Sequence, residues 1–287
     1  MTISPSTQEL LQVLSLWGWI WIIPIVERLS PLNGQKFIRP GMINDLIHTY
    51  HRVHLWSFLN AIFVAWLAAY AQRHAGQGPF LQGSLQGVHW LAGILAILMM
   101  DHIVFYVAHY LSHKVPLLWQ FHRVHHSSQS LDSFSTSRFH IIDKTVFAAP
   151  FLLLVSYFQP DPVMVFLYFS FHDFWGRYGH GNIKDPHWVG YFMSNPKFHR
   201  WHHCNEPEAI DRNFSAVFNF FDYLFGTAYY PKNKIPQSYG EDAYPNNILV
   251  QHYRPFIDCY KIVKNQGWMA LLRKPRSSAK KLEMVHD

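Results

Sequence analysis

Apolar residues in this chain are gathered into long runs that polar segments separate. Three runs cover residues 10–26, 53–71 and 88–108, and two more, 145–158 and 162–179, flank a Gln-Pro-Asp-Pro sequence. A helix needs roughly 20 apolar residues to cross a bilayer core, so the runs predict an all-α integral membrane protein with about four transmembrane helices. The first run is short and rich in tryptophan, which suits a helix on the membrane surface equally well.

The Gln-Pro-Asp-Pro sequence predicts a turn between two antiparallel helices. Asp161 is of a type preferred just before a helix, and Pro162 suits the first helical position. A helix pair that crosses the membrane and returns brings His180 back to the side that the chain left. We therefore expect the polar segments before and after the pair to lie on one face of the membrane.

The chain is mixed and rich in loops from Asn182 onward and ends in a basic tail that starts near Arg273. Residues between Phe256 and Arg273 have the pattern of an amphipathic helix that carries Lys261 and Lys264. Such a helix either rests on an anionic membrane surface or docks on the protein with a solvated face.

Composition narrows the class of protein further. The chain has 287 residues, of which 49% are hydrophobic and 17% aromatic, and its formal charge is +6. A Lys and Arg excess is typical of the cytoplasmic face of a membrane protein, and motifs for base stacking are absent, so we expect no nucleic-acid partner. Cys204 and Cys259 are too few for a disulfide framework. The N-terminus lacks a signal-peptide pattern, so we expect the first apolar run to be retained.

Half of the 20 histidines stand at spacings typical of metal ligands. Positions three and four apart share a helix face, so each HxxHH sequence is expected to present three imidazoles to one side and the HxxxH sequence two. Neutral imidazole is a standard ligand for iron, copper and zinc. Eight or more such nitrogens exceed what one ion takes, which predicts two metals. The candidate ligands are His109, His113, His122, His125, His126, His172, His180, His199, His202 and His203.

Two smaller sets of histidines call for separate interpretations. On a straight helix His172 and His180 are about 12 Å apart, too far for one metal. A break at Gly176 or Gly179 would let both point inward, and otherwise one of them is a ligand, with His180 favoured. The HTYHRVH sequence around His48 also has a spacing of three, but it stands alone, and no site is expected there.

Several motifs then resemble one family in their order. Asp101 before HYLSH, PLLWQFHRVHHS, HGN, NPKFHRWHH and NFSAVFNFFDYLFGT resemble the fatty acid hydroxylase and sterol desaturase superfamily of membrane di-iron enzymes. The resemblance divides the chain into N-terminal membrane helices (1–87), a hydroxylase-like di-iron domain (88–230) and a C-terminal membrane-surface or cytosolic tail (231–287). It implies a cytosolic helical cap that binds two irons through the histidines of the three clusters, with His180 in an additional position.

The resemblance also implies an activity and its requirements. Members use O2 and external electrons to hydroxylate or desaturate a lipid C–H bond, and the substrate here stays open among sterols, fatty acyl chains, carotenoids, ether lipids and hopanoids. Because no cytochrome or ferredoxin sequence is fused to the chain, electrons must come from a separate cytochrome or ferredoxin with its reductase. We expect a multi-pass protein with the metal site on the cytoplasmic side, in a bacterial inner membrane rather than the endoplasmic reticulum.

Further residues are candidates for supporting roles around the ligands. SFSTSRFH resembles a family motif, and its Arg138 and His140 either orient ligands or are structural. The other candidates for orienting ligands are Asp101, Asn182, Asp211 and Asp222. Tyr110 departs from the family, in which many members have Arg after this histidine, so details of substrate or surface are expected to differ.

Two other functions stay open at this stage. A membrane zinc hydrolase would also use histidine ligands, but HExxH is missing and a catalytic zinc takes only three protein ligands. A metal-binding protein without redox activity is disfavoured only by the completeness of the clusters. Metal analysis would distinguish a zinc hydrolase from a di-iron enzyme. O2-dependent turnover would distinguish an oxygenase from a metal-binding protein without redox activity.

Overall fold

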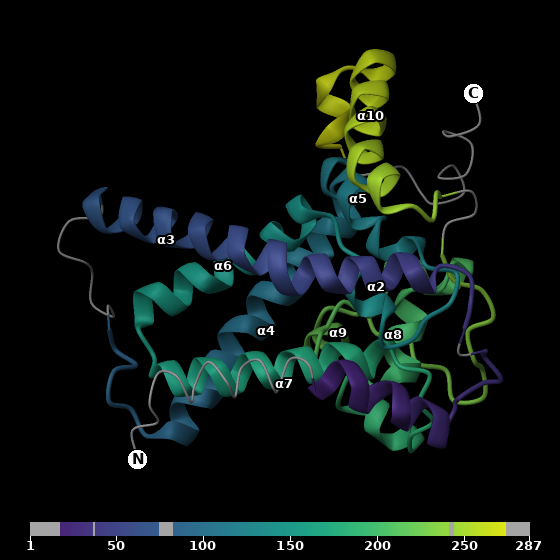
Figure 1. Ribbon diagram of the computed structural model, residues 1–287, viewed down its shortest axis with the longest axis horizontal. Helices are drawn as coiled ribbons and strands as arrows, with labels where there is room; N and C mark the ends of the chain where they lie inside the picture. Colours follow the sequence, from purple (N-terminus) through teal and green to yellow (C-terminus); the bar gives the residue numbers. More distant parts are fainter. Residues whose placement is uncertain (1–17, 37, 75–82, 241–243, 274–287) are drawn as a thin grey trace.

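The computed structural model describes residues 18–36, 38–74, 83–240 and 244–273, and these ranges are all-helical apart from isolated bridges between loops (Figure 1). The longer helices are α2 (Met42–His51), α3 (Ser57–His74), α4 (Trp90–Lys114), α6 (Ile141–Phe158), α7 (Pro162–His180) and α10 (Ile248–Gln266). The shorter elements are α5 (Pro116–His122), α8 (Pro196–His202), α9 (Phe220–Leu224), the π-helix η1 (Arg52–Trp56) and the 3₁₀ turns η2 (His125–Ser127), η3 (Ser135–Ser137), η4 (His187–Tyr191), η5 (Pro207–Ala209) and η6 (Trp268–Leu271).

The predicted turn between α6 and α7 is confirmed in its details. Gln159 ends α6 in the left-handed conformation, with φ of 51°. The carboxylate of Asp161 accepts a hydrogen bond of 2.7 Å from the backbone N–H of Val163, and Pro162 is the first residue of α7. The side-chain cap satisfies one of the N–H groups that a helix start leaves open.

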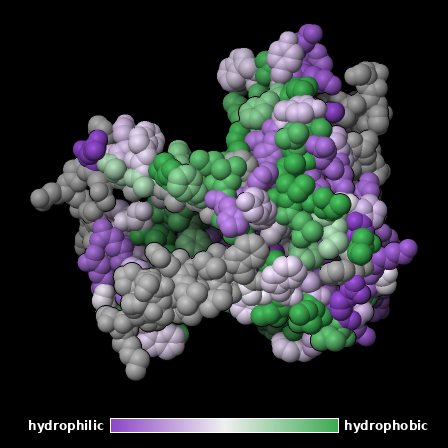
Figure 2. All heavy atoms as spheres, viewed as in Figure 1, coloured by the Kyte–Doolittle hydropathy of each residue, from purple (hydrophilic) through white to green (hydrophobic). Residues whose placement is uncertain are grey.

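Two of the described helices, α4 and α6, are long and apolar enough to cross a membrane. α4 packs against α6 and α7, and α3 packs against α6. Figure 2 shows hydrophobic side chains gathered over α3 as well, on the outside of this bundle. Apolar residues that stay exposed on α3 and α4 include Phe58, Ile62, Phe63, Trp66, Trp90, Leu91 and Leu95. An apolar exterior of this extent is typical of a surface that contacts lipid.

The predicted apolar runs coincide with helices as far as the structure describes them. The run 53–71 lies in η1 and α3, and the run 88–108 lies in α4, which continues to Lys114. Ile97 of α4 is fully buried in a core with Phe151 of α6 and residues of α7.

The N-terminal run is described only in part. Residues 10–17 lie outside the described residues, and residues 18–29 form a helix. This helix lies against α7, where the indole N–H of Trp19 donates a hydrogen bond of 3.2 Å to Ser170 Oγ. Ile20 and Ile23 are buried, so its inner face packs on protein.

The structure supports docking of α10 on the protein. The middle of α10 docks on α5, where the rings of Phe121 and Phe256 lie 5.3 Å apart. Beyond this contact α10 extends away from the rest of the molecule (Figure 1), and η6 turns back against α10 and α5. Tyr260 and Trp268 are exposed. The predicted tail after Arg273 lies outside the described residues.

Buried ion pairs connect α2 to the loop between α5 and α6. Arg39 donates to Asp132 at 2.6 Å and to Asp45 at 2.7 Å, and Arg138 donates to Asp45 at 2.6 Å. All four side chains are buried. Because removal of one partner would leave a buried charge uncompensated, the network fixes how this loop sits against α2.

Candidate metal centre

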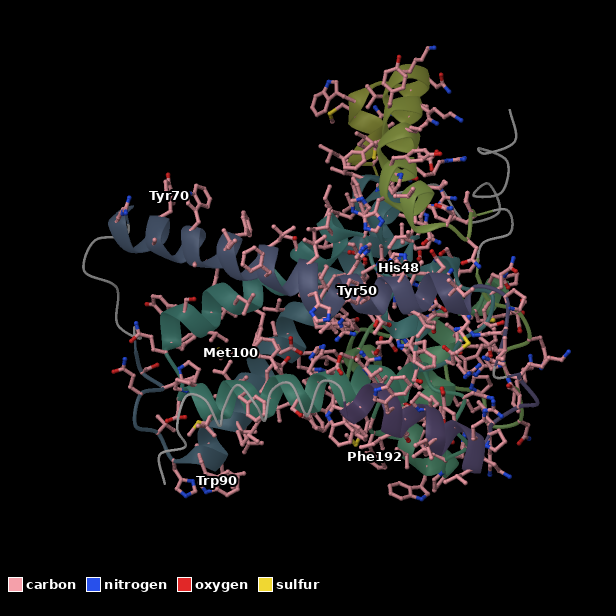
Figure 3. All side chains as sticks on the ribbon, viewed as in Figure 1. His48, Tyr50, Tyr70, Trp90, Met100 and Phe192 are labelled. Carbon is pink, nitrogen blue, oxygen red and sulfur yellow. The ribbon has the colours of Figure 1, made fainter. Side chains whose placement is uncertain are left out.

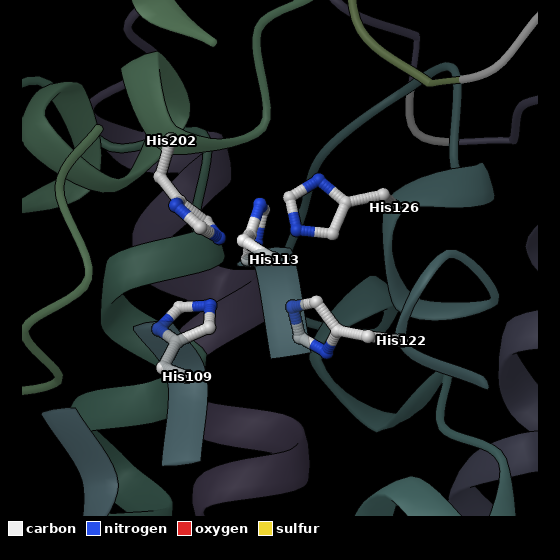
Figure 4. Close-up of side chains that lie close together, drawn as sticks. All are labelled: His109, His113, His122, His126 and His202. Carbon is white, nitrogen blue, oxygen red and sulfur yellow. The ribbon is translucent and has the colours of Figure 1, made fainter. Parts of the chain in front are cut away.

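Five histidines of the predicted set converge on one point. His109 and His113 come from α4, His122 from the end of α5, His126 from η2 and His202 from α8. One nitrogen of each lies within 4.8 Å of one nitrogen of every other, and all five side chains are buried. Figure 4 shows their rings pointing toward a shared space. We call this set the five-histidine group.

Four more histidines form a second set beside the first. The four-histidine group contains His125 of η2, His180 at the end of α7, His199 of α8 and His203, which follows α8. Its ring nitrogens also lie within 4.8 Å of one another. The two groups are in contact, since the rings of His126 and His203 stack with centroids 4.4 Å apart.

The division corrects the expectation that each HxxHH sequence presents its three imidazoles to one place. In HRVHH, His122 and His126 join the five-histidine group, whereas His125 joins the other. In HRWHH, His199 and His203 stay together, and His202 crosses to the five-histidine group. Each pair with a spacing of four therefore shares a group. In α8 the direction of His202 differs by about 60° from that of His199 and by about 100° from that of His203, whereas the latter two differ by only about 40°, so His202 faces another way.

Backbone carbonyls fix the ring orientation of several of these histidines. The acceptors are Phe214 O for His109 Nδ1 at 2.7 Å, Arg138 O for His125 at 3.2 Å, Gly176 O for His180 at 2.9 Å and Arg212 O for His202 at 2.8 Å. A carbonyl oxygen only accepts, so each Nδ1 carries the proton and each neutral ring keeps a lone pair on Nε2. The lone pair is the part of the ring that binds a metal.

The Nε2 atoms are placed as ligand atoms would be. Among the described residues, the buried Nε2 atoms of His109, His122, His126 and His202 have no hydrogen-bond partner. In the four-histidine group, His125 Nε2 lies 3.2 Å from His180 Nε2. Both of these atoms are acceptors in the neutral ring, so this approach is unfavourable unless a cation lies between them. The donor sets of both groups thus fit a metal ion.

Burial keeps these rings neutral. The pKa values of His126, His199 and His203 lie well below the ordinary value, first because burial disfavours the charged form and then because neighbouring imidazoles repel a charge. The same causes lower the pKa of His202 to about 3, although its bond to Arg212 opposes the shift. Neutral imidazole is the form that binds metals.

The structure separates His172 from His180. α7 runs unbroken to His180, so the two residues lie on one continuous helix and Gly176 does not break it. His180 belongs to the four-histidine group, while His172 Nδ1 lies 2.8 Å from Tyr168 Oη and 3.2 Å from Asp101 Oδ2. His172 is in neither group.

The predicted supporting residues lie close to the ligand candidates in three cases. Asp211 Oδ1 lies 3.4 Å from His113 Nδ1. Asp222 accepts from the backbone N–H of Phe214 at 2.8 Å and so holds the peptide that bonds His109. The backbone carbonyl of Arg138 accepts the hydrogen bond from His125 Nδ1.

Two other predicted supporting residues have structural contacts instead. Asn182 donates its backbone N–H to Glu27 at 2.9 Å. His140 accepts from Ile142 N–H at the start of α6 and donates to His252 O at 3.0 Å.

Sequence reasoning missed Asp143. Its carboxylate accepts from His122 Nδ1 at 3.1 Å, and both side chains are 1% exposed. The signal was an acidic residue in the first turn of an otherwise apolar helix, three positions after His140. A carboxylate behind a ligating imidazole orients the ring and raises its basicity.

A cavity reaches both histidine groups. Its wall includes His109 and His122 of one group and His125, His180 and His199 of the other. The apolar part of the wall consists of Phe105, Phe139, Phe147, Trp175, Ala216 and Val217, and charged side chains enter it from Arg52, Lys144 and Asp173. An apolar wall with a few convergent polar groups is typical of a ligand site.

Comparison with known proteins points to one family. Residues 94–227 match the family model of fatty acid hydroxylases. The ornithine lipid hydroxylase OlsE of Rhizobium tropici is 29% identical over 246 residues, which are 82% of this chain and 72% of that protein. Alkylglycerol monooxygenase of Caenorhabditis elegans is 26% identical over 144 residues, 50% of this chain, and that of Danio rerio is 29% identical over 137 residues, 46% of it. These segments cover 28% and 29% of the two monooxygenases. No solved structure matches.

Proposed function

Because this chain belongs to the fatty acid hydroxylase superfamily, we propose that it hydroxylates a membrane lipid with two iron ions, one in each histidine group. The observation that carries the proposal is the pair of adjoining buried groups, which together use nine of the ten predicted histidines. His172 is left outside the ligand set, since it bonds Tyr168 and Asp101.

Each part of the site has a task in this proposal. The irons, when bound, supply the activation of O2 and the oxidation of a C–H bond. The Nδ1 bonds hold the imidazoles in one tautomer, and the apolar cavity wall keeps water from the reacting carbon. One oxygen atom of O2 enters the C–H bond as a hydroxyl group, and the other leaves as water with two electrons and two protons from an external donor. A separate cytochrome or ferredoxin with its reductase is the donor class.

The lipid is proposed to enter the cavity from the bilayer. α4, α6 and α7 all contribute to the cavity wall, through Phe105, Phe147 and Trp175. The named relatives act on an ornithine lipid and on alkylglycerols, which favours hydroxylation over desaturation and a polar lipid as substrate.

The membrane arrangement is proposed to consist of four crossings, α3, α4, α6 and α7, with the histidine groups in a cap on the cytoplasmic side. Figure 3 places Tyr70 and Trp90 at one end of the molecule, far from His48, and aromatic residues of this kind favour a membrane interface. Exposed Lys184 and Lys232 lie in loops of the histidine end, which suits a cytoplasmic face. A bacterial inner membrane is the proposed location, and residues 88–230 the proposed catalytic domain.

Metal analysis and isotope labelling of the purified full chain test the proposal together. The protein should contain about two irons per chain, as the two histidine groups require. With a reductase system and ¹⁸O2, lipid extracted from the producing membrane should gain one labelled oxygen.

Substitutions test whether both histidine groups are needed for the reaction. His125→Ala and His202→Ala remove one ligand from each group and should abolish labelling, because a lost ligand cannot be replaced inside a buried site. His89→Ala removes an exposed histidine at the start of α4 and serves as the matched control. A single zinc per chain, or an unlabelled lipid product that forms without O2, would show that the oxygenase proposal is wrong.

A further inference from the structure

The cavity beside the histidine groups contains an ammonium group that makes no direct ion pair with the described part of the protein. Among the described residues, the ammonium group of Lys144 makes no hydrogen bond and no ion pair, and its recorded contact is with the Phe139 ring, 5.5 Å from the centroid. Lys144 lies in the second turn of α6 and faces the cavity. An ammonium group placed beside aromatic side chains is costly without an anionic partner.

The carboxylates that surround Lys144 already have other partners. Asp173 bonds Arg52 and also Arg177, the latter at 2.9 Å. Asp143 bonds His122, and Asp101 lies 3.2 Å from His172.

Positive side chains outnumber negative ones in the wall of the cavity. Arg52 and Lys144 both line it, and Asp173 is the one acidic residue in its wall within the described ranges. Behind the wall, Arg177 is positive and Asp101 and Asp143 are negative, and each of the three is bonded to a neighbouring side chain. Within the described ranges, Lys144 is the charged side chain of the wall that makes no such bond.

We infer that Lys144 binds an anionic group of the lipid, a carboxylate or a phosphate, while the aromatic wall holds the adjoining hydrocarbon. The inference rests on the proposed function and specifies its substrate class. Because the cavity that contains Lys144 is also lined by His109 and His125, the carbon that is oxidised lies close to the anionic group rather than near the far end of an acyl chain.

Short amphiphiles test the inference without dependence on turnover. Calorimetric titration of the iron-loaded full chain in nonionic detergent would compare hexyl phosphate, hexanol and inorganic phosphate. We expect hexyl phosphate to bind about 10- to 100-fold more tightly than hexanol, the range for a hydrogen bond to a charged group. Inorganic phosphate should bind more weakly than hexyl phosphate because it lacks the chain.

Substitutions identify the residue responsible. Lys144→Met keeps a similar length without charge and should bring hexyl phosphate to the affinity of hexanol, with the iron content and hexanol binding unchanged. Lys144→Arg should retain the preference for hexyl phosphate. Lys264→Met, which removes an exposed lysine of α10, is the control for loss of one charge.

The outcomes separate the inference from the proposed function. Equal affinities for hexyl phosphate and hexanol in the unsubstituted protein overturn the anion site, even if ¹⁸O labelling succeeds. Equal affinities for inorganic phosphate and hexyl phosphate also overturn it, since the ligand would then be free phosphate. A preference for hexyl phosphate that Lys144→Met abolishes supports the site even where no labelled lipid forms, and in that case the hydroxylase proposal alone fails. If Lys144→Met loses its iron, the comparison uses the unsubstituted and Lys144→Arg proteins. A preference for hexyl phosphate over hexanol in both supports the anion site, and its absence in either overturns it.

Discussion

Each imidazole in the two histidine groups has two ring nitrogens. In five of them Nδ1 is hydrogen-bonded to another group of the protein, which orients the ring so that Nε2 faces the shared space. His109, His125, His180 and His202 donate to carbonyl groups, whereas His122 faces the carboxylate of Asp143. A carboxylate that accepts from Nδ1 increases the electron density of an imidazole ligand more than a backbone carbonyl does. Asp143 is therefore well placed to influence how His122 binds a metal.

Asp143→Asn tests this dependence. The amide oxygen can still accept from His122, but the negative charge is lost, so we expect a decrease of about 10- to 100-fold in iron affinity or activity. Iron retention during dialysis against a chelator measures the first quantity. Glu208→Gln changes an exposed carboxylate and should leave retention unchanged. Equal retention in Asp143→Asn would show that the carboxylate has no influence on the metal.

Acid should weaken the site for a related reason. The pKa of His202 is lowered to about 3, from an ordinary value of 6.5, and those of His126, His199 and His203 are lowered well below 6.5. Between the lowered and the ordinary pKa the unfolded chain binds more protons than the folded one, so stability falls as the pH falls below 6.5. The thermal midpoint of the metal-free protein should be constant above pH 7.5 and decrease from pH 6.5 to 4.5. A constant midpoint over both ranges would contradict the pKa directions.

The sequence predicted which histidines gather but not how they divide. Spacing alone assigned His122, His125 and His126 to one place, because a regular helix was assumed through HRVHH. In the structure α5 ends at His122 and a 3₁₀ turn starts at His125, so ring directions change within four residues. Asp143 was missed because its partner is 21 positions away and no short motif connects them.

At the scale of helices, α10 has one part held by protein and another part that projects. The docked part includes Phe256, and the projecting part exposes Tyr260 and Trp268 beside Lys261. The sequence showed this amphipathic pattern without revealing where the docking ends. That boundary depends on α5, which is more than 100 positions earlier in the chain and contacts α10 only after folding.

We expect the apolar face of the projecting part to rest on the membrane surface, since exposed aromatic residues favour the headgroup region. Nitroxide labels at Tyr260→Cys and Lys261→Cys, in a Cys259→Ser background, would report this in lipid vesicles. The label at 260 should be more accessible to oxygen than to a water-soluble nickel complex, and the label at 261 should show the reverse. The same preference at both positions would contradict an interfacial helix.

At the scale of the whole molecule, the histidine groups lie at one end of the helix bundle and the connecting turns lie at the other. The loop before α4 pairs with the end of α6, where Gly83 N–H donates to Tyr157 O at 2.9 Å and Leu85 N–H donates to Phe158 O at 3.0 Å. The bundle therefore has two ends of different character.

Cysteine labelling of intact cells tests the sidedness of these ends. In a Cys259→Ser background, Lys184→Cys and Asn205→Cys should resist an impermeant reagent until the membrane is opened, since both exposed positions lie at the proposed cytoplasmic end. Gln86→Cys, at the opposite end, should react in intact cells. Reaction of Lys184→Cys and Asn205→Cys from different sides would exclude a single cytoplasmic cap.

The short helix α8 has a consequence for how the protein would acquire the two proposed ions. His199 and His203 face one group and His202 the other, so the end of one helix serves both. If two ions bind as proposed, the first would fix the end of α8 and prearrange the second group, so uptake should be cooperative. Native mass spectrometry during iron addition should then reveal mainly empty and doubly occupied chains, with few half-filled ones. Chains with one ion, which could reduce O2 without hydroxylating a lipid, would then stay rare.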